Sequence, residues 1–145
     1  MRGPGREERA AALLFRTARA RVGELQSRLA DIEAAIVSTE TSLDWLAEAV
    51  RAAEDARRGD AAVAAEFARF LEGAAEKRKA LNATRDTLAG ESLALRETLG
   101  EALSEMKKLE HLIEINRRAA ARGERAFRAG GRRPLVVDGG RTGAA

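Results

Sequence analysis

Apolar residues recur along the first half of the chain at alternating steps of four and three. The series holds from residue 11 to residue 53, and Thr39 is its one member that is not apolar. A repeat averaging about 3.5 residues keeps one stripe facing a partner helix when the helices supercoil around each other. The pattern therefore predicts a long coiled-coil helix. Its seam consists of Ala11, Phe15, Ala18, Val22, Leu25, Leu29, Ile32, Ile36, Thr39, Leu43, Leu46, Val50 and Ala53.

The second half of the chain has its own seam in the same rhythm. Two helices with matching repeats and a short connection pack as antiparallel neighbours. We therefore expect an all-α fold, a long two-helix antiparallel coiled-coil hairpin with flexible termini. The second seam consists of Phe67, Leu71, Ala74, Arg78, Leu81, Arg85, Leu88, Ser92, Leu95, Leu99, Ala102, Met106, Leu109, Ile113, Asn116 and Ala120.

Polar residues occupy three positions of the second seam, Arg78, Arg85 and Ser92. In one interpretation the arginine stems cover the seam while their heads reach Glu40 and Glu33 on the first helix. In the other, the middle of the hairpin is weak so that a third surface can pack there. The sequence leaves both interpretations open.

The turn between the helices is marked by its residues. Arg57 and Arg58 place positive charge at the negative end of the first helix dipole. Gly59 suits a left-handed position after a helix, and Asp60 can cap the next one. The expected organisation is one domain: a flexible start at 1–5, helix one at 6–58, the tip at 59–60, helix two at 61–128 and a disordered Gly/Arg tail at 129–145.

Composition agrees with a helical pair and adds a charge asymmetry. Charged residues make up 34% of the 145 residues, and there is no Cys. The formal charge of +3 conceals eight arginines against two carboxylates after residue 116. No stretch has the apolar length of a signal peptide or a membrane span, so we expect a soluble or peripheral protein.

Residue patterns of catalysis, cofactor binding and metal binding are absent from the sequence. There is no GxxxxGK phosphate loop, and His111 is the single histidine. Without a second His or a Cys, it has no companions for a zinc site. A pair of helices also offers no concave apolar cavity. We expect a protein that is not an enzyme and that needs no cofactor.

Three runs of residues resemble the FliJ family, the stalk proteins of flagellar type III export. They are Glu66-Phe67-Ala68-Arg69-Phe70-Leu71-Glu72-Gly73, Lys77-Arg78-Lys79-Ala80-Leu81 and Glu105-Met106-Lys107-Lys108-Leu109-Glu110-His111. The last run, ahead of an Arg/Ala-rich end, is most similar to the alphaproteobacterial members. The resemblance covers residues 6 to 128.

This resemblance implies a function and a set of partners. A FliJ-like protein binds and regulates the hexameric flagellar export ATPase, links it to the cytoplasmic domain of the export gate, and handles export chaperones. It is cytoplasmic and peripherally associated with the inner membrane at the flagellar base, with only indirect membrane contact and no nucleic acid partner.

The resemblance also implies two groups of site residues. The surface for the export gate comprises Phe67, Phe70, Leu71 and Ala74. The end that docks with the ATPase comprises Arg16, Arg19, Lys107, Lys108, Arg117, Arg118, Arg122 and Arg125. Independently of the resemblance, Phe70 lies off the seam on the flank of its helix, where the helical period leaves it in water.

Two further functions compete with the export stalk. A generic structural coiled coil would dimerise or form bundles, with the same seam used between chains. A basic adaptor would bind nucleic acid or an anionic membrane through the arginines after Asn116, because clustered positive charge neutralises phosphates.

Overall fold

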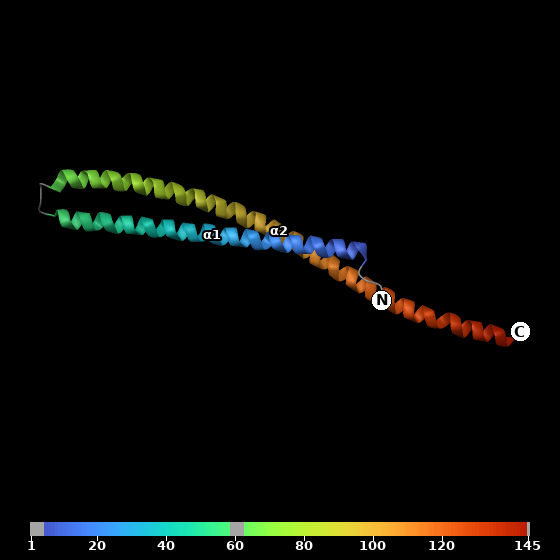
Figure 1. The fold of residues 1–145 in the computed structure, drawn as a ribbon. Coiled ribbons are helices and arrows are strands. Elements are labelled where there is room, and N and C mark those ends of the chain that lie inside the picture. The colour runs from blue at the N-terminus through green and yellow to red at the C-terminus, as the bar shows by residue number, and fades with distance from the viewer. Residues whose placement is uncertain (1–4, 59–62, 145) are drawn as a thin grey trace. The chain divides into compact units, whose positions relative to one another are not determined.

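A computed structural model describes residues 5–58 and 63–144, and their side chains up to residue 130. Helix α1 spans Arg6–Arg57 and helix α2 spans Ala64–Ala144. The two helices pack against each other, running antiparallel as Figure 1 shows, and the described residues contain no strand. The predicted all-α helical hairpin is confirmed.

The chain divides into two units, each formed by one segment of each helix. The inner unit is Val22–Glu101, and the terminal unit combines Met1–Arg21 with Ala102–Ala145. In the inner unit the buried apolar residues include Val22, Leu25 and Leu95, and in the terminal unit Ala11 is buried.

Burial follows the predicted seams closely. Every predicted seam position of α1 is buried or half-buried, and so are all those of α2 except Arg78 and Ala120. Leu25 is the most enclosed, at 1% exposure. Since two helices cover only one stripe of each other, the residues outside the seam remain mostly wet.

The arginines of the second seam differ from the prediction. Arg78 is exposed and Arg85 is half-buried. Glu33 does not pair with Arg85. It pairs with Arg96, whose Nη2 lies 3.0 Å from Glu33 Oε1. Glu33 and Arg96 each follow a seam residue by one position. In an antiparallel pair of helices, residues at the same position relative to the two seams lie on the same side of the pair. Both side chains are about half exposed, so the pair contributes less than about 1 kcal/mol.

The beginning of α1 is capped by its own residues. The Gly5 amide donates to Glu8 Oε2 over 3.2 Å, and the Arg9 amide donates to the Gly5 carbonyl over 3.0 Å. A glutamate three residues inside a helix that accepts from the cap amide satisfies one otherwise unpaired donor. Gly5, predicted within the flexible start, is therefore the N-cap.

The ends of the two helices can be compared with their predicted positions. Helix α1 ends within one residue of the predicted end, and the tip at 59–60 lies outside the described residues. Helix α2 does not end at Arg128 but continues to Ala144, which corrects the boundary of the predicted tail. Glycine raises the free energy of a helix by about 1 kcal/mol without blocking its hydrogen bonds, so Gly130 and Gly131 do not force an end there.

The seam predicts a sharp contrast between two leucines. Leu25→Ala should lower the free energy of unfolding by about 2–3 kcal/mol, because it opens a cavity at the most enclosed position. Leu93 is 71% exposed, so Leu93→Ala should change the free energy of unfolding by less than about 0.5 kcal/mol. Urea unfolding followed by circular dichroism measures both. Equal effects would contradict the seam.

Candidate functional site

The aromatic start of α2 separates one exposed residue from three packed ones. Phe67 and Ala74 are buried and Leu71 is half-buried, all on the seam. Phe70 is 40% exposed, which confirms its predicted position on the flank. Of the four residues expected to contact an export gate, Phe70 alone offers substantial surface while the helices stay paired.

Phe67 is held by the end of α1. The Arg57 guanidinium carbon lies 4.6 Å from the centre of the Phe67 ring, over its face. A cation in this position is attracted by the electron-rich face of the ring, by about 0.5–1 kcal/mol at a partly wet site. Phe67 is thus engaged in joining the two helices in the inner unit.

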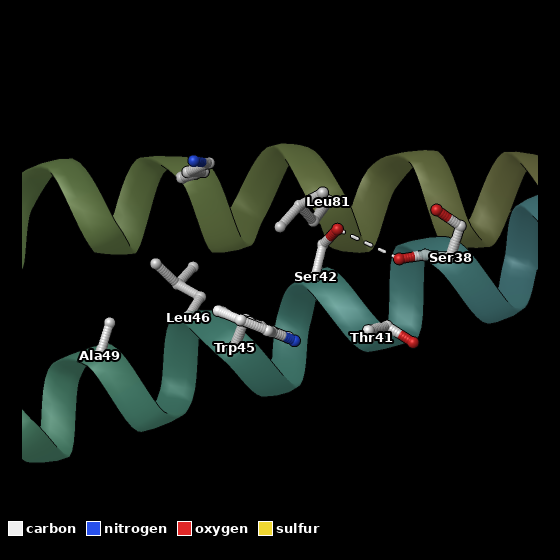
Figure 2. A pocket seen from close by; sticks show the side chains of 8 residues that line it. Ser38, Thr41, Ser42, Trp45, Leu46, Ala49 and Leu81 are labelled. Carbon is white, nitrogen blue, oxygen red and sulfur yellow. Dashed lines mark hydrogen bonds between the residues drawn. The ribbon is translucent and has the colours of Figure 1, made fainter.

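A groove of about 750 Å³ runs beside the seam of the inner unit. Figure 2 shows Trp45 and Ser42 on α1 and Leu81 on α2 around it. Trp45, the one tryptophan of the chain, is 75% exposed. Lys77 is the single charged residue of the lining. The remaining lining residues are Ser38, Thr41, Leu46 and Ala49.

Two of the hydroxyl groups that line this groove donate to carbonyls within α1. Ser42 donates to the Ser38 carbonyl over 3.1 Å, and Thr41 donates to the Val37 carbonyl over 2.9 Å. Thr39, at its seam position, donates to Ala35 over 2.8 Å. The seam tolerates this threonine because its hydroxyl needs no partner from α2.

A second, smaller groove lies where the seam is interrupted by arginine. It measures about 260 Å³ and is lined by Leu46, Val50, Leu71 and Arg78 among others. Arg78 keeps its charged head in water and therefore leaves these apolar side chains partly uncovered. The groove lies at one of the seam positions where the second sequence interpretation expects weak packing between the helices.

The basic end lies within the terminal unit. The first residues of α1, including Arg6 and Glu8, line a groove with Asn116 and Ala120 of α2. All residues from 121 to 130 are exposed, so this part of α2 has no cover from α1. The eight basic residues expected to dock with an ATPase are all exposed: Arg16, Arg19, Lys107, Lys108, Arg117, Arg118, Arg122 and Arg125.

One carboxylate offsets part of this basic charge. Glu114 accepts from Arg118 over 3.2 Å and lies 4.0 Å from Arg117. These are solvated pairs within one helix, worth about 0.3–0.5 kcal/mol each. These pairs hold two arginine side chains in place, and the end of the helix still has a net positive charge.

Among the described residues, no group of three or more His, Cys, Asp or Glu side chains could hold a metal ion. No described helix has the length and apolarity to cross a bilayer.

Sequence reasoning missed Trp45. The seam analysis followed positions that face the partner helix, and Trp45 lies one position before seam residue Leu46. A lone large aromatic residue off the seam was the available signal, since large exposed apolar side chains gather at interaction sites.

Comparisons of the chain with family models, curated proteins and solved structures give no match.

Two neighbouring phenylalanines should respond differently to truncation. Phe67→Ala should cost about 3 kcal/mol of unfolding free energy, because the ring fills the seam. Phe70→Ala should cost less than about 1 kcal/mol, since much of its ring is wet. Thermal and urea unfolding compare the two variants. A collapse of helicity in Phe70→Ala would assign that ring to packing.

Proposed function

We propose that this protein is a non-enzymatic stalk of the FliJ type in the flagellar type III export apparatus. In this role it binds and regulates the hexameric export ATPase, links it to the cytoplasmic domain of the export gate, and receives export chaperones. It would act in the cytoplasm, at the inner membrane beneath the flagellum.

The observation that carries this proposal is the uncovered basic end of α2. A helix that continues beyond the beginning of its partner, with every residue from 121 to 130 exposed, is suited to enter or grip another assembly. Its arginines favour a partner surface with carboxylates, because charged rims complement each other and speed encounter. The resemblance of three sequence runs to FliJ names that partner as the export ATPase.

Phe70 supports the second contact of the proposal. It is exposed at the start of α2, within one of the three runs of residues that resemble the family. A large aromatic side chain that is not needed for packing can anchor in a pocket of a partner, and such anchors dominate binding energy. We assign this role to Phe70 and treat Phe67, Leu71 and Ala74 as its support.

The ATPase contact is tested by turnover. The purified chain should raise the hydrolysis rate of a purified flagellar export ATPase. The pair Arg122→Gln with Arg125→Gln should reduce this stimulation by about tenfold, since each lost charged contact is worth about 1 kcal/mol or more. The matched control is Arg69→Gln with Lys79→Gln, two exposed basic residues of the inner unit, and it should stimulate like the wild type. Absence of both binding and stimulation would refute the stalk.

The gate contact is tested with the same protein. Phe70→Ala should weaken binding to the cytoplasmic domain of the export gate by about tenfold or more, as expected for a hot-spot aromatic. Leu93→Ala, which truncates another exposed apolar residue of α2, should bind normally. Calorimetric titration measures both affinities, and unchanged binding by Phe70→Ala would remove this role.

The groove at Trp45 favours a second candidate, a coiled coil that dimerises. In that case the mass in sedimentation equilibrium rises with concentration and the Trp45 emission shifts to the blue. Trp45→Ser would then abolish the rise in mass, while Val37→Ser, at a 61% exposed position, would keep both the rise in mass and the blue shift. A monomer with constant emission across the concentration range eliminates this candidate.

A further inference from the structure

Large apolar side chains remain in water within the terminal unit. Leu14 of α1 is 56% exposed, and Leu112 and Ile115 of α2 are each 45% exposed. None of them belongs to the seam that holds the two helices together. Exposed apolar side chains that gather in one place mark an interaction surface, whereas scattered ones need no explanation.

These three side chains gather on one side of the helix pair. Leu14 and Leu112 each precede a seam residue by one position. Matched flank positions share a side in an antiparallel pair, as the contact between Glu33 and Arg96 demonstrates for the opposite flank in the inner unit. Ile115 lies one helical turn after Leu112 on α2.

Basic residues continue the same side along α2. Residues three or four apart lie on the same side of a helix. Counting along α2 from Lys108 in such steps leads to Leu112, Ile115, Arg122 and, further on, Ala126. We call this side the outer stripe. Its members are Lys108, Leu112, Ile115, Arg118, Ala119, Arg122, Arg125 and Ala126.

Three carboxylates border the outer stripe: Glu105 lies three residues before Lys108, Glu7 of α1 lines a groove with Ala119, and Glu114 pairs with Arg118. Glu110 and Glu124 lie about 120° or more around α2 from the axis of the stripe, at about 100° per residue, and the stripe itself contains four basic residues and no carboxylate. No described side chain pairs with Lys108, Arg122 or Arg125, and Arg118 pairs with Glu114.

This combination fits a bilayer surface better than a nucleic acid. A helix that lies in the membrane interface places leucine and isoleucine among the acyl chains and its basic residues at anionic headgroups. Phosphates of a nucleic acid would use the arginines but leave the apolar side chains unused. Stacking of single-stranded bases needs aromatic platforms, and no stripe member is aromatic.

We propose that the outer stripe, together with Leu14, is a binding site for an anionic membrane surface. The basic side chains contact the lipid headgroups, and Leu14, Leu112 and Ile115 enter the interface between headgroups and acyl chains. The helices lie on the bilayer and do not cross it. This site does not depend on the export function proposed above.

Flotation with vesicles tests the site on the full chain. Vesicles of phosphatidylcholine and phosphatidylglycerol in equal parts should carry the protein upward, and vesicles of phosphatidylcholine alone should not. Arg118→Gln with Arg122→Gln should weaken binding by about tenfold or more, because each basic residue near the surface contributes about fivefold. Leu112→Ser with Ile115→Ser should weaken it by about tenfold, because the inserted apolar area is lost.

Matched controls separate the stripe from general effects. Arg69→Gln with Lys79→Gln removes the same charge from the inner unit, and Leu93→Ser removes an exposed leucine of α2, so both should bind like the wild type. Circular dichroism should give wild-type helicity for every variant, because the altered residues are exposed or half-exposed.

Three results would overturn the proposal. They are equal binding to vesicles without phosphatidylglycerol, equal weakening by the control variants, and full binding by the Leu112→Ser, Ile115→Ser variant. Tighter binding to double-stranded DNA than to the vesicles would assign the stripe to nucleic acid instead. If the wild-type chain stimulates the export ATPase but does not bind the vesicles, the membrane site is refuted and the stalk proposal stands.

Discussion

The packing of one apolar stripe against another is the interaction on which this structure depends. Among the residues that the structure describes, each helix packs along one stripe of the other, and this stripe is where most apolar area leaves water. The described residues of the seam other than Arg78 and Ala120 are accordingly buried or half-buried, with Leu25 the most enclosed. Charge and small polar residues fill the remaining faces. The same limitation leaves side chains such as Trp45 and Phe70 exposed, where a compact core would have absorbed them.

The seam tolerates polar residues by two different means. Thr39 stays buried because its hydroxyl bonds to the carbonyl one turn earlier in α1. Arg78 leaves the seam and keeps its charge in water, at the cost of uncovered apolar surface on Leu46 and Val50. The two solutions differ because a hydroxyl can be satisfied locally, whereas a guanidinium in a dry seam would need a charged partner from the other helix.

Function in such a molecule depends on faces and ends. Phe67 and Phe70 are three positions apart, yet the first is enclosed by the seam and touched by Arg57 while the second faces outward. The basic residues of the terminal unit divide in a similar way, since Glu114 engages Arg117 and Arg118 but not Arg122. A stalk and a membrane-bound helix pair would share the basic residues of the terminal unit, whereas Leu112 and Ile115 would serve the membrane alone and Trp45 the dimer, so variants of these apolar residues distinguish the three.

The sequence by itself determined the two helices, their seams and the exposure of Phe70, because the alternation of three and four is a property of neighbours along one helix. It did not determine that Glu33 meets Arg96, that a groove opens beside Trp45, or that α2 runs past Gly130 to Ala144. The first two depend on how residues far apart in the chain are aligned across two helices, which no local period encodes. The third reflects that one glycine weakens a helix by only about 1 kcal/mol, so Gly130 and Gly131 mark a weak point and not a fixed end.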